Sequence, residues 1–67
     1  MIDINLNGEP RQIPAATTVS GLLELLKVSP KQVAVEVNQR VVPRIEHGTV
    51  TIQPGDAIEI VTFVQGG

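Results

Sequence analysis

The chain has 67 residues, of which 42% are hydrophobic and 18% are charged. Five Lys and Arg against seven Asp and Glu give a formal net charge of −2, which lacks the positive excess typical of nucleic-acid binding. Phe63 is the single aromatic residue, and no cysteine is present, so base-stacking platforms, disulfides, thiolate metal sites and a cysteine nucleophile are excluded. A chain this short forms one small domain with little room for a catalytic pocket, so we do not expect an enzyme.

The N-terminal residues 1–5 alternate apolar and polar side chains, without the basic start and apolar stretch of a signal peptide. No window approaches the roughly 20 apolar residues of a membrane-spanning helix. We therefore expect a cytoplasmic protein that binds neither membranes nor nucleic acid.

The first predicted element is a β-hairpin. Apolar residues alternate with polar ones over residues 2–6, which indicates a strand with one buried face. Asn7-Gly8 is typical of a two-residue type I′ turn, and residues 11–13 form the returning strand. Pro14 removes an amide donor, so this strand should end there or lie at a sheet edge.

One main helix follows. Thr17-Thr18 offers an N-cap, and Leu25 widens the apolar stripe that begins after it. The stripe has helical spacing and consists of Val19, Leu22, Leu23 and Leu26. Ser29 to Gln32 is interpreted as a single helical turn or a tight loop, with Ser at a cap and Pro at the first helical position.

The second half of the chain is predicted to be mostly β. Residues 33–37 form a strand, 38–40 turn the chain into a short piece at 41–42, and 44–48 form a polar loop. Residues 49–52 are a short β candidate, 53–56 a type II turn, and 57–64 the longest strand. Since one helix covers only one face of a sheet, the pattern predicts an α+β fold, a mixed sheet with one main helix packed on one face.

Few side chains suggest chemistry. His47 stands in the polar loop with no serine near it in sequence, so we interpret it as a solvated loop histidine. The acidic residues are scattered, and neither their spacing nor a single histidine predicts a metal site. The last predicted strand is apolar on both faces, so Val61 and Phe63 either pack in the core or form an exposed patch.

The end of the chain is unusual, because the last strand runs into Gln65-Gly66-Gly67. Glycines add nothing to packing, and without Cβ atoms a thread of three residues can reach at most about 10 Å into a narrow channel. Such a thread delivers the α-carboxylate of Gly67. Attack of that carboxylate on the α-phosphorus of ATP would give an acyl adenylate, which a sulfur or nitrogen nucleophile can open. The alternatives are a frayed tail or a cloning scar.

The whole chain resembles the ThiS family of sulfur carriers in thiamine biosynthesis, which are small ubiquitin-like β-grasp proteins. The residues that carry the resemblance are Ile2 to Gly8, Thr18-Val19, Leu22-Leu23, Val33 to Asn38, Val41 to Arg44, Gly55-Asp56, Ile58 to Val61 and Gly66-Gly67. The resemblance implies a single β-grasp domain over residues 1–64 and a flexible carrier tail over residues 65–67.

The resemblance also implies a mechanism. A ubiquitin-activating-like adenylyltransferase (ThiF-like) would adenylate Gly67 with ATP and Mg²⁺, while this chain binds no cofactor. Sulfur from a donor such as a cysteine desulfurase would then give a C-terminal thiocarboxylate, which donates sulfur to thiazole synthase (ThiG-like). Gln65 and Gly66 would thread the tail, and Val61 and Phe63 would form a partner patch.

Two departures and two alternatives accompany this interpretation. Members of the family often have acidic residues and an aromatic after Val-Pro-Arg, whereas Ile45-Glu46-His47 follows here. The small subunit of molybdopterin synthase (MoaD-like) shares the fold and the Gly-Gly end, but it is usually longer and carries an early Phe/Arg-rich segment that residues 7–14 lack. The other alternative is a non-catalytic β-grasp interaction module or protein modifier.

Overall fold

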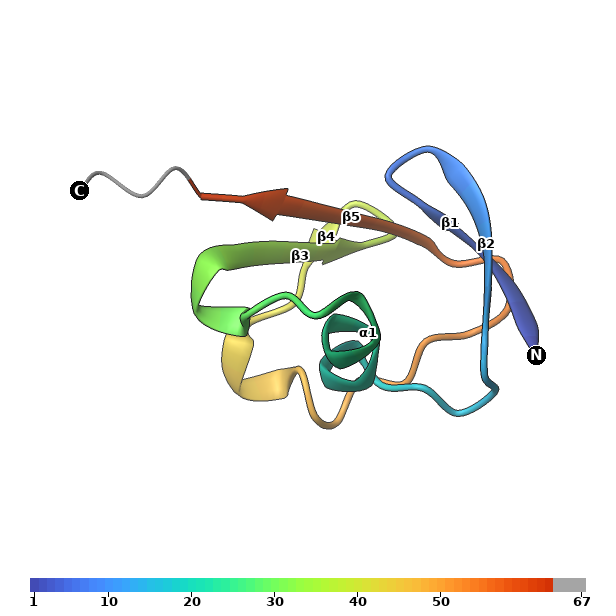
Figure 1. Ribbon diagram of the computed structural model, residues 1–67, viewed down its shortest axis with the longest axis horizontal. Helices are drawn as coiled ribbons and strands as arrows, with labels where there is room; N and C mark the ends of the chain where they lie inside the picture. The colour runs from blue at the N-terminus through green and yellow to red at the C-terminus, as the bar shows by residue number, and fades with distance from the viewer. Residues whose placement is uncertain (64–67) are drawn as a thin grey trace.

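The computed structural model describes residues 1–63, which form a five-stranded sheet and one α-helix (Figure 1). In chain order the elements are β1 (Ile2–Leu6), β2 (Glu9–Ile13), α1 (Val19–Leu26), the 3₁₀ turn η1 (Pro30–Gln32), β3 (Val33–Val37), β4 (Arg40–Val41), the 3₁₀ turn η2 (Arg44–Glu46) and β5 (Ala57–Thr62). The strand order is β2-β1-β5-β3-β4, with β1 and β5 parallel and the other neighbours antiparallel. The predicted α+β fold with a mixed sheet is therefore confirmed.

The β1–β2 hairpin has the predicted turn. Asn7 (φ 50°) and Gly8 (φ 84°) both take positive φ, as a type I′ turn requires. The Asn7 side chain reaches across to β5, where its Oδ1 accepts from the backbone N–H of Ile60 at 2.8 Å. β2 lies at the sheet edge and ends before Pro14, as its missing amide donor predicted.

The β3–β4 hairpin repeats this arrangement without glycine. Asn38 (φ 53°) and Gln39 (φ 69°) both lie in the left-handed region. The Oδ1 of Asn38 accepts from the backbone N–H of Ala57 at 3.0 Å, where β5 begins. An asparagine in each turn thus fixes β5 between the two hairpins.

The helix begins at the predicted N-cap. The Oγ1 of Thr18 accepts from the Gly21 N–H at 3.1 Å, and Lys27 ends the helix in a left-handed conformation. Leu25 was expected to widen the buried stripe, and this was wrong, since it is an exposed residue. The buried core consists of Ile4, Ile13, Val19, Leu22, Leu23, Val33, Val35, Ile52 and Ile58.

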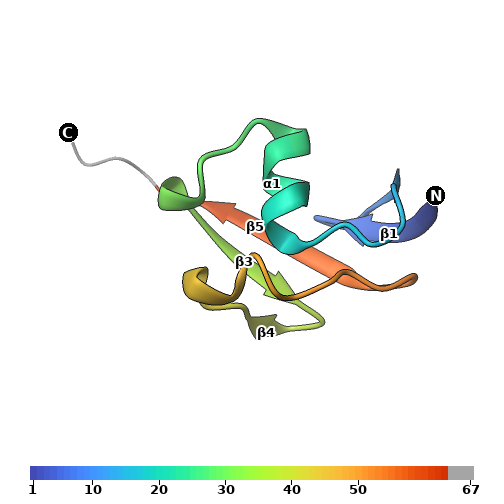
Figure 2. The same ribbon diagram turned by 90° about the horizontal axis from the view of Figure 1, so that it is seen from below.

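The chain between β4 and β5 lies on the same side of the sheet as α1, and η2 lies beside β3 and β4 (Figure 2). The β candidate at 49–52 is not a strand. It makes one isolated bridge, between Thr18 and Thr51, and buries Ile52. The turn that follows has the predicted Gly55 at positive φ, 85°. α1 and this segment cover one face of the sheet, while Ala57, Glu59 and Val61 of β5 are exposed on the other.

Candidate functional site

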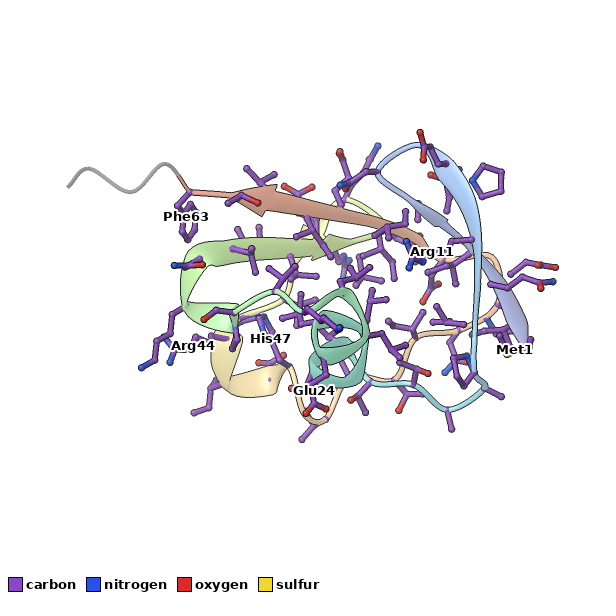
Figure 3. The ribbon with its side chains drawn as sticks, viewed as in Figure 1. Met1, Arg11, Glu24, Arg44, His47 and Phe63 are labelled. Carbon is purple, nitrogen blue, oxygen red and sulfur yellow. The ribbon has the colours of Figure 1, made fainter. Side chains whose placement is uncertain are left out.

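The end of β5 is the last part of the chain that the structure describes. The strand ends at Thr62, and the backbone N–H of Phe63 donates to the carbonyl of Gln32 in η1 at 2.8 Å. This hydrogen bond fixes the chain direction up to Phe63 (Figure 3). The predicted site residues Gln65, Gly66 and Gly67, and the domain boundary at residue 64, lie outside the described residues.

Both residues of the candidate partner patch are accessible. Val61 is 53% exposed and Phe63 is 49% exposed. The structure therefore agrees with the exposed patch and not with packing of these two side chains in the core. Val61 pairs in register with Ala34 of β3, so the side chains of these two residues lie on the same, uncovered face of the sheet.

A concavity of about 250 Å³ begins at Phe63. We call it the terminal groove. Phe63 lines it together with η1, the first residues of β3, and the chain that runs from β4 into η2. Val41, Val42 and Pro43 are among its apolar lining residues, and Ala34 links it to Val61. The terminal groove therefore continues the Val61–Phe63 patch around the end of the sheet.

The terminal groove is basic. Lys31 and Arg44 line it, whereas no Asp or Glu does. The sequence analysis gave neither of these two cations nor Val41 a role in binding a partner. The available signal was the apolar pair Val41-Val42 on an otherwise polar stretch, followed at once by Pro43-Arg44.

His47 corrects the sequence interpretation, because it is buried (4% exposed) and not solvated. The ring lies under the turn after β4, where Nε2 and the Val42 carbonyl oxygen are 3.1 Å apart. Because a carbonyl oxygen only accepts, Nε2 is the donor in this contact. Nδ1 has no hydrogen-bond partner among the described residues. His47 thus holds one wall of the terminal groove.

A second concavity of about 330 Å³ lies between the two hairpin turns. Its polar lining includes Asn5, Asn7 and Gln39. Glu36 and Glu59, which face each other across β3 and β5, give it an acidic character. Within residues 1–63, no group of three or more His, Cys, Asp or Glu side chains is arranged to hold a metal ion. In the same range, no helix is long and apolar enough to span a membrane.

Comparisons with known proteins agree with this geometry. The crystal structure of a thiamine biosynthesis protein (ThiS) from Geobacter metallireducens superposes with a TM-score of 0.86, at 33% identity, over 98% of this chain and all of that chain. The sulfur carrier protein ThiS of Escherichia coli is 33% identical over 98% of this chain and all of its own length. A thiazole synthase of Magnetococcus marinus is 50% identical over 96% of this chain, which spans only 20% of that protein.

The mixed sheet, the single helix on one face and the match to the solved structure define the class as a β-grasp protein. A sequence model described as the ThiS family matches residues 4–67, and the chain belongs to that family. The relatives of this name are called sulfur carriers, which agrees with the expectation of a carrier instead of an enzyme.

Proposed function

We propose that this protein carries sulfur for thiazole formation as a thiocarboxylate on Gly67. The observation that carries the proposal is the family match, which extends to the terminal Gly66-Gly67. The domain over residues 1–64 presents the tail over residues 65–67, and Gln65 and Gly66 thread it into partner active sites.

The chemistry takes place at the α-carboxylate of Gly67. One carboxylate oxygen attacks the α-phosphorus of ATP, pyrophosphate leaves, and a glycyl adenylate forms. A sulfur nucleophile such as hydrosulfide then attacks the carbonyl carbon, AMP leaves, and a proton is released. ATP and Mg²⁺ belong to a ThiF-like adenylyltransferase, and a sulfur donor such as a cysteine desulfurase supplies the sulfur.

The recipient in this proposal is a thiazole synthase (ThiG-like). A segment of the M. marinus protein named thiazole synthase is 50% identical to this chain, which supports a partnership between the two. It also favours the thiazole branch over the MoaD-like alternative. All of these reactions belong to the cytoplasm.

Deletion of Gly67 tests the proposal. The deletion leaves the terminal carboxylate on Gly66, about 3.5 Å short of its place on Gly67, and removes no residue of the described core. We therefore expect ATP–pyrophosphate exchange by the cognate adenylyltransferase to fall to background. The urea unfolding midpoint should stay unchanged. Exchange at the wild-type rate with the deleted chain would refute a role for Gly67, and a lowered midpoint would refute the independent tail.

A further inference from the structure

We propose that the terminal groove is the docking surface for the adenylating partner. The groove receives an acidic segment of that enzyme, in which an apolar side chain stands next to a carboxylate. This inference rests on the proposed function and adds the surface and the kind of segment it fits. Four observations carry it: the apolar lining, the charge, the fixed walls and the distance to the carrier end.

The apolar part of the groove is open to a partner. Val41 is 65% exposed on the two-residue edge strand β4, and Phe63 is 49% exposed. Both line the groove, together with Val42 and Pro43. An apolar side chain that enters the groove and covers Val41 and Phe63 removes apolar surface from water, which stabilises the complex.

Charge identifies the occupant as acidic. Lys31 and Arg44 are two of the five basic residues in a chain with net charge −2, and they line the same groove without a carboxylate. The second concavity has the opposite character, since Glu36 and Glu59 line it and no Lys or Arg does. An acidic segment is therefore attracted to the terminal groove and repelled from the other concavity, which orients the partner.

The walls of the groove are held before any partner arrives. The backbone N–H of Val42 donates to the Val35 carbonyl at 2.9 Å, and Nε2 of His47 donates to the Val42 carbonyl at 3.1 Å. The backbone N–H of Phe63 donates to the Gln32 carbonyl at 2.8 Å. Preformed walls lower the entropy that binding must overcome.

The groove also lies at the right place for an enzyme that acts on the carrier end. Phe63 and Arg44 lie at the same end of the molecule (Figure 3). Gly67 comes four residues after Phe63 in sequence, and four residues of chain span at most about 14 Å. An enzyme seated in the groove therefore has the Gly67 carboxylate within reach of its own active site.

Charge reversal tests this assignment. Lys31→Glu and Arg44→Glu are compared with Arg11→Glu, which changes the net charge equally at an exposed position of β2, at the other end of the molecule (Figure 3). Val41→Glu tests the apolar wall. The measurements are the KM for the carrier and kcat in ATP–pyrophosphate exchange with the cognate adenylyltransferase. The Kd of the complex is measured by calorimetry without ATP.

We expect Lys31→Glu, Arg44→Glu and Val41→Glu each to raise KM and Kd about tenfold with kcat unchanged. The effect of the two charge reversals should shrink at high salt, because these groups are solvent-exposed. Arg11→Glu should behave as wild type. Urea unfolding checks that each variant is folded.

Three outcomes overturn the assignment. If wild-type carrier is adenylated and the groove variants match Arg11→Glu, docking is elsewhere, although the proposed function stands. If the enzyme neither binds nor adenylates the folded wild-type chain, both are wrong. Self-association of the wild-type chain that Arg44→Glu abolishes, with enzyme binding unaffected, would assign the groove to a second copy instead.

Discussion

At the scale of single residues, His47 shows how a site component can escape sequence reasoning. Its neighbours Arg44, Glu46 and Gly48 are polar or small, which is typical of a solvated loop. The 3₁₀ turn η2 reverses the chain after Pro43, and this brings the imidazole under Val42, five residues earlier in sequence. Burial therefore depends on the path of the turn, which no local pattern of side chains records.

Replacement of His47 measures this contribution. We expect His47→Ala to lower the free energy of unfolding by about 2 kcal/mol, because it leaves the Val42 carbonyl without its donor and opens a space in the interior. His47→Gln keeps an N–H donor near the position of Nε2 and should cost less. Urea denaturation gives both values, and equal stability of His47→Ala and wild type would contradict the structural role.

At the scale of elements, the sequence predicted the parts governed by local periodicity. Alternation over residues 2–6 and 33–37 gave β1 and β3, and Thr18 gave the start of α1. Residues 49–52 looked like a strand but lie on the helix side of the sheet, where no free strand edge is available and only Thr51 makes a bridge. Leu25 has an apolar side chain but lies on the helix face turned away from the sheet. Both errors concern which element an apolar residue packs against, and this depends on the tertiary structure and not on the local sequence.

The two hairpin turns allow a matched comparison. Both need positive φ at two positions, but the first has Gly8 and the second has Gln39. A residue with a side chain pays about 1–2 kcal/mol to adopt positive φ, whereas glycine does not. Glycine gives back about 0.5–1 kcal/mol of this difference, because its unfolded chain has more conformational entropy to lose. Gln39→Gly should therefore stabilise the protein by about 0.5–1 kcal/mol, and Gly8→Gln should destabilise it by a similar amount. Thermal unfolding checks both signs, and a destabilised Gln39→Gly would contradict the argument.

At the scale of the whole molecule, the two faces of the sheet differ. α1 and the chain between β4 and β5 cover one face (Figure 1), whereas Val61 is exposed on the other, and the exposed side chains of Val41 and Phe63 line the terminal groove. The two terminal glycines led the sequence analysis to predict a carrier tail, and this stays a prediction because residues 64–67 lie outside the described part of the chain. The terminal groove was not predicted, because its residues come from separate stretches, 30–34, 41–47 and 63, that only the fold brings together.

The central claim is that the chain carries sulfur on its last residue. Incubation of the intact protein with the cognate adenylyltransferase, ATP, Mg²⁺ and sulfide, followed by intact and fragment mass measurement, tests it directly. We expect one oxygen to be exchanged for one sulfur, with the change confined to the fragment that contains Gly67. An unchanged mass while the enzyme forms the adenylate, or sulfur found on any other residue, would contradict the claim.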